Sequence, residues 1–339
     1  MKNFPKISII IPCRNEEVFI GKCLNSIVSQ NYPKDRVEVL ITDGMSTDST
    51  REIVRSFFGK LDIKIIENYG RYTPIGLNLA IKKATGDVLA RIDAHSYVNN
   101  DYIKNCVRGL RKYNADSVGG VLKTLPRNNS FIDKTIVRAF VSRFGTGNSY
   151  YKLGSKYVKE VDTAAFFCCP KETFEKNGLF NEKLIRTQDM EWHKRLKKNG
   201  GRIFLLPNAV VYYYIKSDLK GFIRHNFVNG IWATLPFKYS DHIPVSFRHL
   251  IPLFFVLGII LLTLGSWLLP VIFIPLLLAI TLLYSLLSVI FAIQIAIKEK
   301  NIIYVLTSPI AFLIIHFGYG LGSLWGLILF LKKDQNGKS

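Results

Sequence analysis

The chain has 339 residues, of which 49% are hydrophobic, and a formal net charge of +20. This combination points to two classes, nucleic-acid-binding proteins and membrane proteins with a basic cytoplasmic face. No charged residue occurs between positions 250 and 297, a run far too long for a soluble core helix, so we expect a membrane protein without a nucleic-acid partner.

The first hundred residues alternate short apolar runs with helical patterns. Strands are expected at residues 7–11, 37–41, 63–66 and 88–92, and helices at 16–30, 49–58 and 73–84. This alternation predicts an α/β fold with a mostly parallel sheet covered by helices on both faces. Such sheets bind ligands at the carboxyl ends of their strands.

Polar residues gather where three of these strands should end. They are Pro12, Arg14 and Glu16, then Asp43 and Ser46, then Arg91, Asp93 and His95. Asp93 and His95 are two apart on an extended chain and face the same side, which suits a divalent cation above a bound phosphate. Asp43 and Ser46 could equally shape a turn and cap a helix. Because neither a G-x-G-x-x-G nor a P-loop motif occurs, the pattern favours a nucleotide held by carboxylates and a metal.

A further acidic position follows in the second half of this region. Residues 161–170 predict a buried strand, and a helix should run from Thr187 to the Gly200-Gly201 pair. Asp189 would lie in its first turn, where the helix dipole keeps a carboxylate ionised, the state that a general base needs. It could also be an ordinary N-terminal helix carboxylate; Glu191 is a second candidate for the base and is also a candidate acceptor-binding residue.

The last third of the chain is apolar. Residues 249–269, 271–297 and 302–331 each reach membrane-spanning length, although Pro309 could kink the third or make it re-entrant. We therefore predict a cytoplasmic domain at 1–235, a linker at 236–248, a multi-pass membrane domain at 249–331 and a polar tail at 332–339. Just before the first span, Arg224 and Trp232 could meet an acceptor or anchor the chain among the membrane lipids.

Several motifs, in a fixed order, resemble those of family 2 glycosyltransferases. ISIIIPCRNEE is similar to the family's opening strand and nucleotide loop, VLITDGMSTDST to its acidic turn, and TGDVLARIDAH to the segment with its metal-binding D-x-D. The segment beginning at Gln188-Asp189 is similar to its E-D motif, with Gln in place of Glu. The resemblance covers roughly residues 6–232. The R-x-D-A-H form is most similar to the succinoglycan-type glucosyltransferases, which build bacterial exopolysaccharide.

The resemblance implies the nucleotide-sugar-binding GT-A fold and an inverting transferase. The expected donor is a UDP-sugar, and the expected acceptor is a glycan on a polyprenyl diphosphate or another lipid carrier. Asp189 would be the base, Asp93 and His95 would hold Mn²⁺ or Mg²⁺, and donor binding would involve Pro12, Arg14, Glu16, Asp43, Ser46, Arg91 and Asp93. Since His95 replaces the usual carboxylate, Mn²⁺ suits the site better than Mg²⁺, unless His95 is purely structural.

Two other functions remain open. The chain could be a non-catalytic membrane subunit that binds a nucleotide sugar or glycan for an export complex. It could also be a processive polysaccharide synthase, although FIRHNFVNGIW lacks the Q-x-x-R-W pattern of polymerising relatives.

Overall fold

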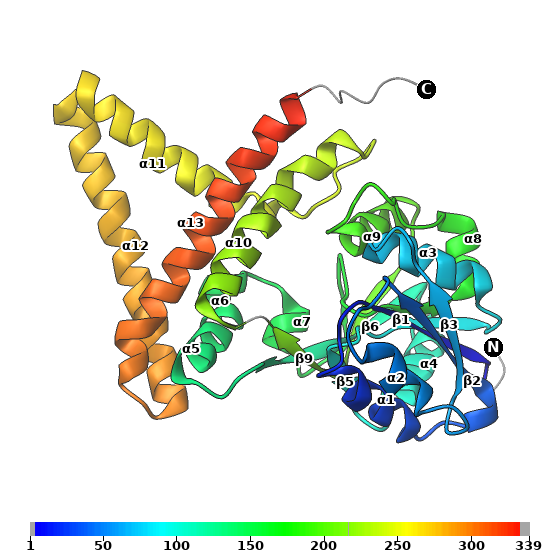
Figure 1. Cartoon of the computed structure of the whole chain (residues 1–339). Helices are drawn as coiled ribbons and strands as arrows, with labels where there is room; N and C mark the ends of the chain where they lie inside the picture. Colours follow the sequence, from blue (N-terminus) through cyan, green and yellow to red (C-terminus); the bar gives the residue numbers. More distant parts are fainter. Residues whose placement is uncertain (1–3, 216, 333–339) are drawn as a thin grey trace. The chain divides into compact units, whose positions relative to one another are not determined.

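The computed structural model describes residues 4–215 and 217–332, which form two compact units (Figure 1). Unit 1 comprises the chain up to Thr124 together with Tyr150–Tyr214, and unit 2 comprises Leu125–Ser149 and the chain from Ile215 onward. Residues 125–149 and 215–235 thus group with the apolar helices in this division, and the boundary of a catalytic domain at residue 235 remains a prediction. Of the predicted tail, only Lys332 lies within the described residues.

Unit 1 is built on one mixed sheet with the order β3-β2-β1-β4-β8-β6-β9-β5. The parallel part consists of β1 (Ile7–Cys13), β2 (Val37–Asp43), β3 (Asp62–Glu67) and β4 (Val88–Arg91), which confirms the predicted parallel strands. The remaining strands are β5 (Ser96–Val98), β6 (Ser117–Pro126), β8 (Cys168–Pro170) and β9 (Ile203–Ile215), with β7 (Lys159–Glu160) paired to β9. β4 joins the two parts, because it pairs in parallel with β1 and antiparallel with β8. The pairs β6–β8 and β5–β9 are also antiparallel.

Only the end of the predicted strand at 161–170 forms a strand. Phe166 has a φ of 53°, in the left-handed region, and this interrupts the extended backbone just before Cys168. The first predicted helix, at 16–30, is also shorter in the structure, where it runs from Ile20 to Val28 and residues 17–19 form turns.

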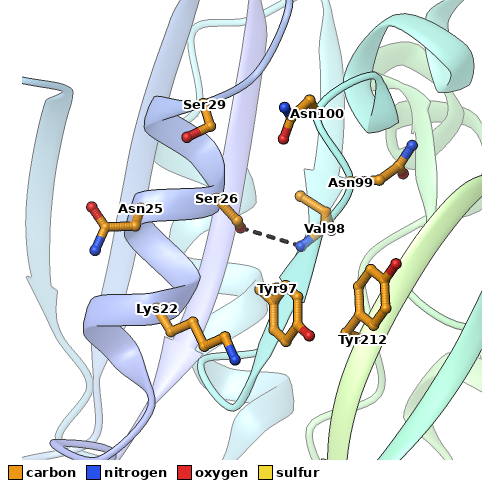
Figure 2. A pocket seen from close by; sticks show the side chains of 9 residues that line it. All are labelled: Lys22, Asn25, Ser26, Ser29, Tyr97, Val98, Asn99, Asn100 and Tyr212. Carbon is orange, nitrogen blue, oxygen red and sulfur yellow. Dashed lines mark hydrogen bonds between the residues drawn. The ribbon is translucent and has the colours of Figure 1, made fainter.

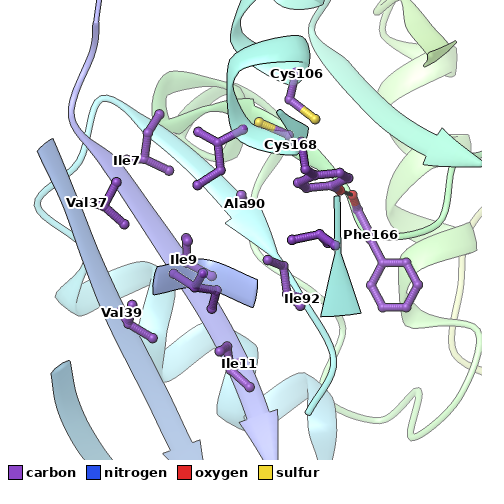
Figure 3. Close-up of a cluster of buried hydrophobic side chains, with 14 of the residues drawn as sticks. Ile7, Ile9, Ile11, Val37, Val39, Ala90, Ile92, Cys106, Phe166 and Cys168 are labelled. Carbon is purple, nitrogen blue, oxygen red and sulfur yellow. Dashed lines mark hydrogen bonds between the residues drawn. The ribbon is translucent and has the colours of Figure 1, made fainter. Parts of the chain in front are cut away.

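Helices cover both faces of the sheet, as predicted. One apolar cluster joins the sheet to α1 (Ile20–Val28), α2 (Thr50–Arg55) and α4 (Tyr102–Lys112), and the other joins it to α3 (Thr73–Lys83), α8 (Lys171–Asn177) and α9 (Gln188–Lys198). Ile9 and Ile11 point into the first cluster, shown in Figure 3, and Ile10 points into the second. A strand buried on both faces explains the unbroken run of isoleucines, each contributing about 1.5–3 kcal/mol by burial.

Unit 2 contains three helices that are long and apolar enough to cross a membrane: α11 (Ile251–Leu268), α12 (Pro270–Glu299) and α13 (Ile303–Leu331). α13 continues through Pro309 as one helix. Its glycines serve close packing against α10 (Leu219–Thr234): a Cβ on Gly322 would lie 2.0 Å from the Phe227 carbonyl oxygen. Small residues commonly allow such close approach between membrane helices.

The sequence assigned no role to residues 125–149, but specific contacts join them to unit 2. α5 (Phe131–Phe140) carries Arg138, whose Nε lies 2.9 Å from the Glu299 carboxylate. α6 (Arg143–Thr146) carries Phe144, whose carbonyl oxygen lies 2.9 Å from His316 Nε2, while His316 Nδ1 lies 2.9 Å from the Tyr284 hydroxyl. His316 is therefore satisfied by two hydrogen-bond partners. Unit 1 contains the short helix α7 (Tyr150–Leu153).

Candidate active site

The polar loops that follow β1 and β2 are fastened to each other. The backbone amide of Asn15 donates to Ser46 Oγ at 2.9 Å, and the amide of Thr47 donates to Asn15 Oδ1 at 2.9 Å. The two loops are neighbours because β1 and β2 pair in parallel and end together, Cys13 opposite Asp43. The sheet thus brings the first two predicted sets of polar residues to one edge.

Asp43 is buried at this edge and already has partners. Arg51 Nε lies 2.5 Å from its Oδ2, and the backbone amide of Ser46 donates to the same oxygen at 3.1 Å. These contacts match the alternative in which Asp43 shapes the turn. A nucleotide would share this carboxylate with Arg51. Pro12 is partly buried and Arg14 is exposed at the same strand end.

Asp93 is held by Arg91, the last residue of β4. Arg91 Nε lies 2.8 Å from Asp93 Oδ1 and Nη2 lies 3.3 Å from Oδ2, and the two side chains are only 10% and 14% exposed. Burial opposes the charge on Arg91, but Asp93 and Asp189 outweigh it and raise its pKa above the ordinary value. One buried guanidinium therefore interacts electrostatically with both key carboxylates of the sequence prediction.

His95 is held from both sides by residues distant in the sequence. Its Nδ1 lies 2.9 Å from Glu16 Oε1, and its Nε2 lies 3.0 Å from the hydroxyl of Tyr213. Tyr213 reaches this position because β9 pairs antiparallel with β5, which places it opposite Ser96. Tyr213 was not among the residues predicted from the sequence, since three consecutive tyrosines in a strand give no sign of which one faces the site.

We expect Tyr213→Phe to weaken UDP binding by about twofold to tenfold, the cost of one hydrogen bond. The ring would remain, but His95 would lose one of its two anchors beside Asp93. Isothermal titration of UDP into the full-length protein measures the change. Tyr214→Phe is the matched control, because Tyr214 lies next along the strand and its hydroxyl accepts a bond from Lys22 instead. Equal weakening in both variants would contradict a specific role for Tyr213.

The residues at this edge fit a divalent cation only together with a bound diphosphate. Among residues 4–215 and 217–332, no cluster of three His, Cys, Asp or Glu side chains could hold a metal. Both ring nitrogens of His95 have partners, so the histidine would have to release one in order to bind. Asp93 can supply one carboxylate, and magnesium-type sites often combine one or two carboxylates with substrate phosphates.

Asp189 lies in the first turn of α9, as predicted, and is partly buried. The helix follows Thr187, whose backbone is left-handed with a φ of 61°. The second candidate, Glu191, is only 4% exposed, and its carboxylate lies 3.1 Å from Arg195 Nε. Arg195 also donates to the Leu179 carbonyl oxygen at 2.7 Å, so this pair fastens α9 to the preceding loop. Asp189, by contrast, interacts with Arg91.

His193 lies one turn after Asp189 and is fully buried. Burial lowers its pKa from 6.5 to about 4, although Asp189 acts in the opposite direction. The folded protein thus holds His193 neutral, with ring nitrogens 3.3 Å from the hydroxyls of Ser117 and Thr163.

This burial predicts acid sensitivity. Because the unfolded chain binds the proton of His193 more tightly, its contribution to stability is present above pH 6.5 and is lost as the pH falls toward 4. Thermal unfolding, followed by fluorescence of the neighbouring Trp192, should show a falling midpoint over this range. His193→Gln should flatten that dependence. An equal acid-induced decrease in the variant would assign the effect to other groups.

Of the three predicted acceptor residues, Glu191 lies on α9, and the other two lie on α10 in unit 2. Arg224 is exposed and Trp232 is partly buried. Their role toward an acceptor remains a prediction.

Comparison with known proteins identifies the family. Residues 8–174 match the model described as Glycosyl transferase family 2. The dolichyl N-acetyl-alpha-D-glucosaminyl phosphate 3-beta-D-2,3-diacetamido-2,3-dideoxy-beta-D-glucuronosyltransferase of Methanococcus voltae is 31% identical over 232 residues, 66% of this chain and 71% of that protein. Succinoglycan biosynthesis protein ExoA of Rhizobium meliloti is 28% identical over 262 residues, covering 72% and 77%.

A solved structure agrees in fold. The mannosyltransferase PcManGT of Pyrobaculum calidifontis, in complex with GDP-Man and Mn²⁺, superposes with a TM-score of 0.57 at 19% identity, over 91% of this chain and 87% of that one. This superposition confirms the predicted GT-A fold, and the family model and the Methanococcus relative confirm the predicted family. The chain belongs to glycosyltransferase family 2, and it is an enzyme that uses nucleotide sugars to build glycans or polysaccharides.

Proposed function

We propose that this enzyme transfers one sugar from a UDP-sugar to a lipid-linked glycan at the cytoplasmic face of a membrane. The observation that carries the proposal is the buried ion pair of Arg91 and Asp93, with Nε 2.8 Å from Oδ1, together with the effect of Asp189, which also raises the pKa of Arg91. It groups the candidate diphosphate-binding carboxylate with the candidate base. The named activity of the Methanococcus relative, on a dolichyl phosphate sugar, supports a lipid-linked acceptor, and the name of ExoA supports a role in exopolysaccharide synthesis.

In the proposed reaction, Asp189 accepts the proton of the acceptor hydroxyl. The acceptor oxygen forms a bond to the anomeric carbon as the bond from that carbon to the β-phosphate oxygen breaks, with inversion. UDP leaves with the electron pair. Arg91 pairs with Asp93, and Glu16 and Tyr213 fix the ring of His95. A divalent metal held by Asp93 and the donor would neutralise charge on the departing diphosphate.

The three apolar helices of unit 2 support catalysis at the cytoplasmic face of a membrane. α11 and α12 would form a hairpin that returns the basic Lys298-Glu299-Lys300 connector to the cytoplasmic side, as the positive-inside rule favours. Anionic lipid headgroups would attract the net positive charge of the protein. Holding the acceptor at the bilayer makes transfer effectively intramolecular.

Purified full-length protein, incubated with UDP- or GDP-sugars, Mn²⁺ and a polyprenyl-diphosphate-linked sugar, tests the proposal. We expect acceptor-dependent release of UDP, with loss of activity on chelation of the metal and the addition of one sugar. Absence of release from every donor would favour the non-catalytic subunit. Long products would identify a processive synthase, and release of GDP alone would correct the nucleotide.

A further inference from the structure

A hollow lies in unit 1, between α1 and the β5–β9 strand pair. It has a volume of about 550 Å³ and is lined by residues of α1, β5, the turn after β5, and β9 (Figure 2). Side chains alternate between the faces of a strand, so Tyr212 lines this hollow while the next residue, Tyr213, contacts His95. The hollow is therefore separated from the candidate donor site by the thickness of the strand pair.

One wall of the hollow is a rigid aromatic stack. The rings of Tyr97 and Tyr212 are parallel to within 3°, with centres 4.5 Å apart. Lys22 Nζ lies 4.3 Å from the centre of the Tyr97 ring, and Lys123 Nζ lies 5.3 Å from that of Tyr212. Lys22 also donates to the Tyr214 hydroxyl at 2.7 Å. A wall fixed in this way before binding would lower the entropic cost of holding a ligand.

Apart from Val98, the rest of the lining is uncharged and polar. Figure 2 shows Ser29 and Asn100 at the end of the hollow away from Lys22, and both residues are exposed. An amide offers donors as well as an acceptor, and a hydroxyl offers both, which matches the hydroxyl groups of a sugar. Among the described residues, no carboxylate lines the hollow, and the ammonium group of Lys22, which does line it, already contacts two tyrosines. This chemistry suits a neutral, hydroxyl-rich ligand better than an anion or an aliphatic chain.

We propose that this hollow is a second saccharide site, which binds a neutral oligosaccharide separately from the nucleotide sugar. Tyrosine ring edges and hydroxyls would contact the sugar rings, and Asn100 would hydrogen-bond to their hydroxyls. Binding of an oligosaccharide in the hollow does not depend on the proposed catalytic mechanism. The proposed saccharide site and the proposed transfer reaction can therefore be refuted separately.

Saturation-transfer NMR on the full-length protein, in a detergent without a sugar headgroup, tests the site. The probes are cellotetraose, maltotetraose and chitotetraose. We expect transfer to at least one of them, and a loss of affinity of about tenfold in Tyr212→Ala and in Asn100→Ala. Tyr157→Ala is the control, because Tyr157 is 75% exposed and lies outside the hollow.

Asn100→Ala is the second test variant because it removes an exposed side chain and leaves the tyrosine stack in place. Loss of binding in this variant would therefore not be caused by collapse of the stack. UDP should bind equally to the wild type and to Asn100→Ala, and it should not displace the oligosaccharide. The proposal is overturned if none of the three probes binds, if binding survives in both hollow variants, or if UDP competes with the probe.

Discussion

Asp189→Asn should lower sugar transfer by about 100- to 10,000-fold, the usual contribution of a general base. Asparagine keeps the shape of the side chain but cannot accept the proton of the acceptor hydroxyl. UDP binding should be retained, because the nucleotide loops contain none of the changed atoms. Initial rates of UDP release with acceptor, together with titration of UDP, separate the two effects.

Glu191→Gln is the matched control for this variant. Glu191 is paired with Arg195, which fastens α9, so its replacement should lower the thermal midpoint more than the transfer rate. If Glu191→Gln abolished transfer with unchanged stability while Asp189→Asn remained active, Glu191 would be the base.

Asp93→Ala should abolish detectable transfer and also destabilise the protein. Removal of Asp93 leaves the guanidinium of Arg91 buried without its bidentate partner, a change that costs about 3–5 kcal/mol at buried ion pairs. Metal-dependent UDP binding should disappear as well. Denaturant unfolding and titration of UDP with and without Mn²⁺ measure these effects. UDP binding that needs Asp93 but is indifferent to metal removal would refute the metal role.

The double variant Arg91→Met, Asp93→Ala distinguishes structure from chemistry. With both charges removed, much of the lost stability should return, because an apolar side chain suits the buried position of Arg91. Transfer should remain absent, since the diphosphate would still lack Asp93. Recovery of transfer in the double variant would show that Asp93 serves only to neutralise Arg91.

Much of the parallel sheet could be predicted because each strand is marked by an apolar run and by the polar residues that directly follow it in the sequence. The isoleucines of β1 show that the strand is buried on both faces, and the polar residues after it mark where it ends. The position of Asp189 in the first turn of its helix could be predicted for the same reason. The antiparallel half was harder: β8 has only three residues, and its start depends on the unusual backbone of Phe166.

The sequence by itself determined the fold class, the apolar helices and the identity of the acidic candidates, since each follows from periodicity or spacing within a short segment. Only the tertiary structure decided what those candidates contact. The partners of His95 come from positions 79 and 118 residues away, Glu16 and Tyr213, and the register of β9 against β5 selects Tyr213 from its neighbours. Likewise, Asp189 raises the pKa of Arg91 although the two residues are far apart in the sequence, an effect that depends on how α9 packs in the fold. Such long-range pairings depend on strand register and helix packing, which no local pattern encodes.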